Sequence, residues 1–294
     1  MVNRQSSFWD EKTLAHGQGK LTKQKEMRIG WVESFLFSRH HGGTFNYIDL
    51  NAGDGFNWKA RIRGTPLTAV DNLNKAEVRD YAAYFVDNRK EAIKKLEGKI
   101  SADYRHHFFP GVDNGVFLRT ILPNLIPVRS HGLIMCDPNG PSHAPFADIV
   151  STMPIYSNLD LLMYWPAIDF KRGWGARANP DAIVKRGPAT FGHPKNWRHA
   201  PKLKDFIESC QRRYWCISPL GKIQRFLIVG TNNPYVKNSK GKIVPLAYPP
   251  YGFHDVAAEE GRRLVNLADT IKEKNKKGAS YASAPARGDI SADG

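Results

Sequence analysis

The chain has 294 residues, 41% of them hydrophobic, which is enough to bury a core in one large α/β domain or two small ones. Lys and Arg outnumber Asp and Glu by 43 to 28, and the net charge of +15 favours an anionic partner, although a merely basic, soluble surface remains the alternative. The three cysteines are too few and too irregularly spaced for a disulfide framework or a CxxC zinc site. The start MVNRQSSFWDEK lacks the apolar stretch of a signal peptide, and no run of eighteen apolar residues indicates a membrane span. We therefore expect a cytoplasmic protein without a metal site.

The first half of the chain alternates helical and extended patterns. Apolar residues recur at helical intervals over 21–40, and a helix there would end at the glycines 42 and 43. Strands are then expected at 44–50, 81–86 and 104–109, and the last two are followed by helices over 88–99 and around 116–122. This alternation predicts a parallel, doubly wound sheet with right-handed crossovers.

The second half changes this rhythm. The nearly continuous apolar run at 131–137 is typical of a strand covered on both faces, and 158–165 is the next strand. Segments 213–218 and 224–230, joined by PLGK, predict an antiparallel hairpin, and a helix follows near 255–273. We therefore expect one domain over 1–275 with a basic insertion at about 168–212, and a disordered tail over 276–294.

Acidic residues end three successive strand units, and ligands in open α/β sheets bind beyond the carboxyl ends of the strands. Asp49 follows the first strand, Asp87 the second and Asp113 the third. Between the first two lies NAGDG, in which Gly53 and Gly55 allow a tight turn and a close approach of the backbone to a ligand. A glycine-rich turn with solvated acidic ends is the alternative interpretation.

The chemistry of these residues favours S-adenosylmethionine over a dinucleotide as the ligand. A dinucleotide site would need GxGxxG opening a helix under the pyrophosphate, but FNWKARIRG follows the second glycine here. A carboxylate at Asp87 suits the two hydroxyls of a ribose, and Asp113 with Asn114 suits an adenine amine. Asp49 would then orient the methionine part of S-adenosylmethionine.

Five segments together resemble a known family, the three-Cys-motif partner proteins: YIDLNAGDGFN (47–57), RGTPLTAV (63–70), FVDNR (85–89), FPGVDNG (109–115) and IMCDPNGP (134–141). The resemblance covers about residues 20–235. It implies a Rossmann-like class I methyltransferase fold, with a mostly parallel seven-stranded sheet and a C-terminal antiparallel hairpin. The sequence departs from the family pattern at Asn51, Asp54 and Asn139.

The cofactor site predicted from these segments binds S-adenosyl-L-methionine and comprises Asp49, Asn51, Ala52, Gly53, Gly55, Asp87, Asp113 and Asn114. Its reacting end is predicted at CDPNGP, after the fourth strand. In amino-methylating enzymes a related motif binds the target amine through an acidic or amide side chain and a proline carbonyl, which here are Asp137 and Pro138, while Asn139 adds a polar contact. An ordinary strand-ending turn is the alternative.

The motif lacks an aromatic residue to stack on a flipped base, because Gly140 stands in its place. Trp165, Phe146 and Tyr164 are candidates to replace it.

The expected insertion concentrates positive charge. From Lys171 to Arg213 there are eleven Lys or Arg residues against three acidic ones. This excess of eight positive charges is more than half of the net charge of +15. Aromatic residues are interleaved, a mixture typical of a groove that neutralises phosphates and stacks bases, although a solvated cationic face is the alternative. The predicted nucleic-acid contacts are Lys171, Arg172, Trp174, Arg177, Lys185, Arg186, Lys195, Trp197 and Arg198.

The sequence thus predicts a methyltransferase that acts on nucleic acid, with DNA favoured over RNA as the substrate and an amino nitrogen such as that of adenine as the acceptor. Two alternatives stay open. One is a methyltransferase of another acceptor, such as RNA, a modified base or a protein. The other is a non-catalytic nucleic-acid-binding protein or partner subunit on the same scaffold.

Overall fold

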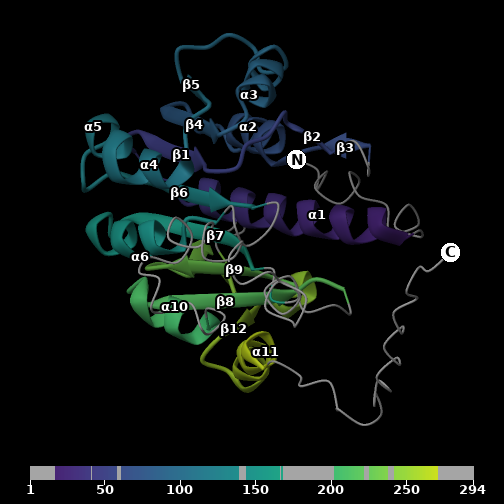
Figure 1. Ribbon diagram of the computed structural model, residues 1–294. Coiled ribbons are helices and arrows are strands. Elements are labelled where there is room, and N and C mark those ends of the chain that lie inside the picture. The colour runs from purple at the N-terminus through teal and green to yellow at the C-terminus, as the bar shows by residue number, and fades with distance from the viewer. Residues whose placement is uncertain are drawn as a thin grey trace, which may run out of the picture.

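The computed structural model describes residues 17–40, 42–57, 61–138, 144–165, 167, 202–221, 225–237 and 242–270. Its centre is one eight-stranded sheet with helices on both faces (Figure 1). The strands of this sheet are β1 (Phe45–Asp49), β4 (Tyr81–Asp87), β5 (His106–Pro110), β6 (His131–Cys136), β7 (Leu159–Trp165), β8 (Tyr214–Pro219), β9 (Phe226–Thr231) and β12 (His254–Asp255).

The strand order is β12-β8-β9-β7-β6-β1-β4-β5. From β5 to β7 all neighbours are parallel, whereas β9 is antiparallel to both β7 and β8. Five parallel strands closed by a hairpin whose second strand inserts beside the last of them form the Rossmann-like class I methyltransferase fold. The predicted fold class is therefore confirmed, and β12, which pairs with β8, adds an eighth strand to the predicted seven.

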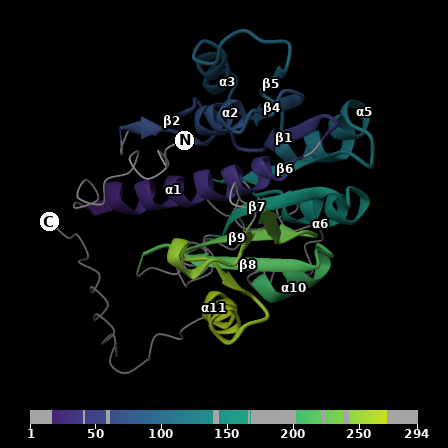
Figure 2. The ribbon, with the colours of Figure 1, turned by 180° about the vertical axis from the view of Figure 1, so that it is seen from behind.

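Helices cover the two faces in separate groups. One face carries α1 (Gly17–Ser38), α2 (Thr65–Lys75) and α3 (Lys90–Glu97), and Figure 2 shows α1 running across it. The other carries α4 (Asn114–Val116), the π-helical turn η2 (Phe117–Ile121), α5 (Leu122–Leu125), α6 (Phe146–Ile155), α10 (Leu203–Ser209) and α11 (Glu259–Asp269). Four short strands and one 3-10 turn lie outside the main sheet: β2 (Phe56–Asn57), β3 (Ile62–Arg63), β10 (Tyr235–Lys237), β11 (Ile243–Pro245) and η5 (Pro249–Tyr251).

The central strands are apolar throughout because successive side chains enter two different cores. On β1, Tyr47 packs toward α1, α2 and α3, and the next residue, Ile48, packs toward the opposite helices. Phe85 and Val86 repeat this alternation on β4. Burial on both faces explains the continuous apolar runs in the sequence.

The predicted elements lie where the patterns placed them, with three differences. Three helices have no predicted counterpart: α2 and α6, which contain or begin beside prolines, and α10, which falls within the expected basic insertion. The helix predicted near 255–273 begins at Glu259, because residues 254 and 255 pair with β8 instead. The sheet edge at β12 was therefore missed.

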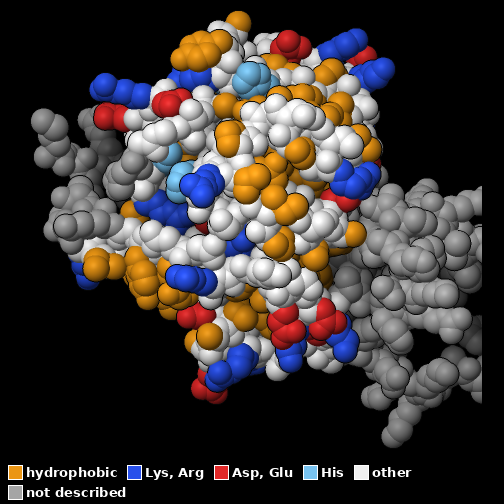
Figure 3. Space-filling view, turned by 90° about the vertical axis from the view of Figure 1, so that its left-hand side faces the viewer, with side chains coloured by type: hydrophobic (Ala, Val, Ile, Leu, Met, Phe, Trp, Pro, Cys, Tyr) orange, Lys and Arg blue, Asp and Glu red, His pale blue; other side chains and the backbone are white. Residues whose placement is uncertain are grey.

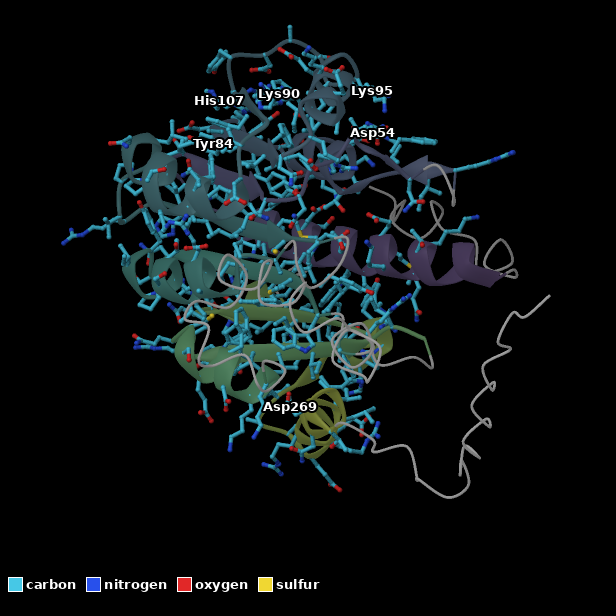
Figure 4. All side chains as sticks on the ribbon, viewed as in Figure 1. Asp54, Tyr84, Lys90, Lys95, His107 and Asp269 are labelled. Carbon is cyan, nitrogen blue, oxygen red and sulfur yellow. The ribbon has the colours of Figure 1, made fainter. Side chains whose placement is uncertain are left out.

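Side-chain contacts hold the elements at the two ends of the sheet, α10 and α11 at one end and β4 and β5 at the other. Asp269 at the end of α11 accepts hydrogen bonds from the backbone N–H groups of Leu203 (2.6 Å) and Lys204 (3.2 Å), and so caps the start of α10. At the other end of the sheet, the rings of Tyr84 and His107 stack at 5.0 Å, side by side on β4 and β5 (Figure 4).

Hydrophobic side chains gather on the face that carries α4, α5 and α6 (Figure 3). The exposed ones on or next to these helices are Val116, Leu125, Val128 and Ile155. Within the described part of the chain, no helix combines the length and apolar character that a membrane crossing requires. The three cysteines are free and buried.

Candidate functional site

The strand order reverses between β1 and β6, the position where open α/β sheets bind ligands. The loop after β1 is held by both neighbours, since Leu50 donates its N–H to the carbonyl of Met135 and Ala52 donates to Val86. Across the same gap, the Cys136 thiol on β6 donates to Asn51 Oδ1 at 3.4 Å. Asn51, one of the departures from the family pattern, thus joins the two strands at the switch point.

Gly53 and Gly55 both have left-handed backbones, with φ of +62° and +72°, which strains any residue with a Cβ. They differ in surroundings. A Cβ on Gly55 would lie 2.5 Å from Leu96 Cδ1 and 3.0 Å from Leu67 Cγ, so this glycine is needed for packing. A Cβ on Gly53 would meet only Arg89 Nη2, at 3.5 Å. Gly53 is the glycine of the pair that faces the candidate site.

Asp49 is 1% exposed at the carboxyl end of β1. Its Oδ1 accepts the N–H of Asn51 at 3.0 Å. Burial raises its pKa to about 8, because this bond offsets only part of the desolvation cost and Asp137, Asp87 and Glu26 repel its negative charge. At neutral pH the carboxyl is therefore protonated, and a cation arriving beside it would favour its ionisation.

A further buried carboxyl, that of Glu33 on α1, is linked to Asp49 through the Tyr47 hydroxyl. The Tyr47 hydroxyl lies 3.3 Å from Glu33 Oε1 and 3.5 Å from Asp49 Oδ2, and Asn72 donates to Glu33 Oε2 at 3.0 Å. One hydroxyl donates a single proton, so a protonated carboxyl must donate to it in turn. Burial raises the pKa of Glu33 well above its ordinary range, which supplies that proton.

Asp87 ends β4 and is bonded on both oxygens. Arg89 donates to it from its backbone N–H at 2.9 Å and from its guanidinium at 3.0 Å, and Gly53 N–H donates to Oδ2 at 3.0 Å. Burial opposes the charge, but the Arg89 and Gly53 bonds outweigh it and lower the pKa of Asp87. The Arg89 side chain is 57% exposed, so a ligand that bonds this carboxylate would have to displace a guanidinium that water can then solvate.

Asp113 is exposed and caps α4, because its Oδ1 accepts the N–H of Val116 at 3.0 Å. Asn114 is the first residue of that helix. The following residue, Gly115, packs so closely that a Cβ would lie 2.4 Å from Asp148 Oδ2. The predicted adenine contacts therefore stand on a helix start that is fixed by its neighbours.

Asp137 follows β6 directly and forms an ion pair with Lys25 of α1. The Lys25 ammonium also lies 3.7 Å from Glu26 Oε1 and 5.4 Å from the centre of the Tyr164 ring. Burial opposes the charge of Lys25, but Asp137 and Glu26 outweigh it, so its pKa is raised and the ammonium persists. The structure thus brings a residue of the N-terminal helix to the predicted reacting end.

Pro138 is buried beside this pair, and Asn139 lies outside the described residues. Of the three aromatic candidates, Trp165 and Phe146 are 1% and 4% exposed and pack against Phe206. These two are core residues and do not present a ring to a base. Tyr164 is half-buried and contacts Lys25.

All nine predicted nucleic-acid contacts, from Lys171 to Arg198, lie outside the described residues. Arg212, counted in the same basic segment, is 7% exposed and donates to the carbonyls of Leu159, Met153 and Tyr156. This arginine holds the sheet and helix α6 together and contributes nothing to a basic surface. Among the described residues, no group of three or more His, Cys, Asp or Glu is arranged to hold a metal ion.

No family model and no curated protein matches this chain. Among solved structures, the chain is similar to a "putative methyltransferase" from Thermobifida fusca YX, with 11% identity, a TM-score of 0.42, and coverage of 75% of this chain and 87% of that one. It is also similar to protein LPL1258 from Legionella pneumophila, with 12% identity, a TM-score of 0.39, and coverage of 77% and 89%. Both TM-scores are below 0.5, so the assignment of the fold rests on the strand order.

Sequence reasoning did not include Lys25, Glu26, Glu33, Tyr47 or Arg89 in the site. A signal for two of them exists in the helix at 21–40. Glu26 and Glu33 are seven residues apart and share a helix face with Ile29, which is buried. Acidic residues on an apolar stripe are costly unless they have partners, so this spacing marks them as buried and bonded.

Proposed function

We propose that this protein is a methyltransferase that uses S-adenosylmethionine and acts on nucleic acid, at an amino nitrogen such as that of adenine in DNA. One observation carries the proposal: Asp49, Asp87 and Asp137 converge at the carboxyl edge of a sheet with the class I methyltransferase strand order. Asp113 lies beyond the neighbouring β5 on the same edge.

The chain offers a separate group for each part of the cofactor. Asp87 would accept the ribose hydroxyls once Arg89 swings away, and Asp113 with Asn114 would meet the adenine. Gly53 leaves room for backbone approach, because nothing but Arg89 lies near its missing Cβ. Asp49, which is protonated when no cation is near, suits the charged methionine end. Bound there, the cofactor supplies an electrophilic methyl group.

The acceptor end consists of Asp137 and the carbonyl of Pro138, with Asn139 in sequence after them. Two accepted hydrogen bonds would hold an amine so that its lone pair points at the methyl carbon. Methyl transfer to an amine held by Asp137 and Pro138 would form the N–C bond while the S–C bond broke with its electron pair left on sulfur, and the amine would lose a proton to water. The sulfonium would lose its positive charge, and the proton released by the amine would carry the same charge to water.

Support for a nucleic-acid substrate comes from charge. Over 171–213 there are eleven Lys or Arg residues against three acidic ones, and the ten other than the buried Arg212, with Trp174 and Trp197 among them, suit a phosphate backbone and its bases.

Transfer of labelled methyl from S-adenosylmethionine to unmodified DNA, RNA and protein, followed by mass spectrometry of nucleosides, tests the function. We expect label in DNA or RNA as an N-methylated base, and loss of transfer in Asp137→Ala with cofactor binding retained. Label in protein alone would support methylation of another acceptor instead. Full activity of Asp137→Ala would refute the role of that residue.

A second candidate is a non-catalytic nucleic-acid-binding protein or partner subunit on this scaffold. A specific observation favours it: Lys25 and Arg89 satisfy Asp137 and Asp87 without any ligand. This candidate predicts binding to nucleic acid without methyl transfer to any acceptor.

A further inference from the structure

The reacting end contains more ionisable groups than the proposed transfer uses. Asp137 after β6 and Glu26 on α1 flank one cation, the ammonium of Lys25, while Glu33 on α1 and Asp49 after β1 meet at the Tyr47 hydroxyl. Thr65 of α2 donates to Glu26 Oε2 at 3.2 Å. Lys25 therefore neutralises the carboxylate closest to the predicted acceptor position.

The geometry of Lys25 distinguishes two roles. The Lys25 amine pairs with Oδ2 of Asp137, the side chain that would also hold the acceptor amine, but a nucleophile needs a lone pair. The ammonium of Lys25 is bonded to one carboxylate, lies 3.7 Å from a second and faces the Tyr164 ring, all of which favour its charged form. A permanently protonated lysine has no lone pair, so it does not receive the methyl group.

A fixed positive charge matters here because the proposed reaction removes positive charge from the sulfonium. Bare carboxylates beside the sulfonium would stabilise the bound cofactor more than the transition state, in which that charge is already dispersing. Stabilising the ground state in this way raises the barrier. A cation placed among the carboxylates limits this effect.

We propose that Lys25 is a specificity-determining residue of this site, an internal counter-ion of Asp137 that lowers the preference of the protein for the cationic cofactor over its neutral product. This inference rests on the proposed function, because it assigns the sulfonium to the edge of the sheet beside Asp137. It adds a residue from the N-terminal helix, which comes to the site only through the packing of α1 against the sheet (Figure 2).

Calorimetric titration with S-adenosylmethionine and with S-adenosylhomocysteine tests it, since these ligands differ in the charge on sulfur. We expect Lys25→Met, which keeps most of the length of the side chain without its charge, to shift the ratio of the two affinities toward S-adenosylmethionine by about tenfold. Asp137→Asn removes a negative charge and shifts the ratio the opposite way. The double variant restores the charge balance and the wild-type ratio.

The outcomes separate the inference from the function on which it rests. If wild-type protein binds both ligands but the ratio is the same in Lys25→Met and in Asp137→Asn, Lys25 is merely structural and the inference is overturned. If wild-type protein binds neither ligand, the proposed function falls together with it. Should Lys25→Met not fold, Asp137→Asn and the double variant still give the two ratios needed.

Discussion

At the scale of single residues, the candidate site contains a carboxyl group whose burial lowers the stability of the folded protein. Asp49 lies in the core at 1% exposure with a pKa of about 8, against an ordinary value of 3.8. An amide would satisfy both neighbours of this carboxyl, because its oxygen can accept from Asn51 N–H and its NH2 group can donate to the Tyr47 hydroxyl. A destabilising carboxyl at a strand end is typical of a functional group.

Asp49→Asn should therefore stabilise the protein. Between about pH 4 and pH 8 the folded protein holds a proton that the unfolded chain releases, so the stability of the wild type falls as pH rises through this window. The amide lacks this titration. The shift spans about four pH units at about 1.4 kcal/mol each, so we expect a gain of about 5 kcal/mol at pH 8 and almost none at pH 4, measured by urea unfolding at both values. Equal stability of the two proteins at pH 8 would contradict the assigned pKa.

A second residue-scale prediction separates backbone strain from ligand contact. Gly53→Leu fills the position beside Arg89 and should weaken binding of S-adenosylmethionine at least tenfold. Gly43 also has a left-handed backbone, with φ of +74°, and nothing lies within 4 Å of its missing Cβ. Gly43→Leu thus carries a similar strain, and we expect it to lower stability similarly while leaving the affinity unchanged in calorimetry. Loss of affinity in both variants would indicate strain alone.

At the scale of elements, the sequence predicted the strands better than their surroundings. The central strands were predictable because burial on two faces leaves continuous apolar runs, and the hairpin of β8 and β9 because its turn is short. Helices α2 and α6 were not predicted, since TPLTAVDNLNK and FADIVSTMPI carry prolines and mixed polar residues in place of a clear apolar stripe. Helix α10 was not predicted either, because its seven residues are too few to show a period within the basic segment. Two-residue β12 is too short to leave any pattern.

The same difference holds for the site. Strand-end acids such as Asp49 and Asp87 could be found because topology alone brings them to one edge. Lys25 and Arg89 reach that edge only through the packing of α1 and the path of the chain after β4, neither of which leaves a periodic signal. Their ion pairs with Asp137 and Asp87 depend on side-chain positions that spacing does not encode.

Helix α10 gives an element-scale prediction. Lys202 at its N-cap provides no side-chain cap, and Asp269 of α11 accepts the first two N–H groups instead. Asp269→Ala should cost about 1 kcal/mol of unfolding free energy, the usual effect of losing a cap. Glu208→Ala, on the same helix and exposed, is the matched control and should cost much less, because its 3.9 Å pair with Lys204 is a surface ion pair. Equal losses would argue against capping by Asp269.

At the scale of the whole molecule, acidic and basic residues are concentrated in different parts of the chain. The sheet edge gathers carboxyls that suit a cationic cofactor, and the excess of Lys and Arg over 171–213 suits an anionic substrate. Under the proposed function, the acidic sheet edge would attract the cofactor and the basic segment would attract nucleic acid, so the two ligands would not compete for the same residues.

Replacing Lys185 and Arg186 by alanine tests the basic segment. If both contact phosphates, the slope of log affinity for DNA against log salt should fall in magnitude by about 2, and binding should weaken. Alanine at Lys94 and Lys95, exposed on α3, removes the same charge elsewhere and should leave the slope unchanged. Identical slopes in both double variants would favour a merely solvated face.

The central claim is that Asp49, Gly53 and Asp87 form one wall of a cofactor site. Calorimetric titration of wild-type protein and of Asp49→Ala with S-adenosylmethionine and S-adenosylhomocysteine tests it most directly. We expect wild-type protein to bind both ligands at one site per chain, and Asp49→Ala, still folded by circular dichroism, to lose that binding. Absence of heat with either ligand in the wild type, or undiminished affinity in Asp49→Ala, would contradict the claim.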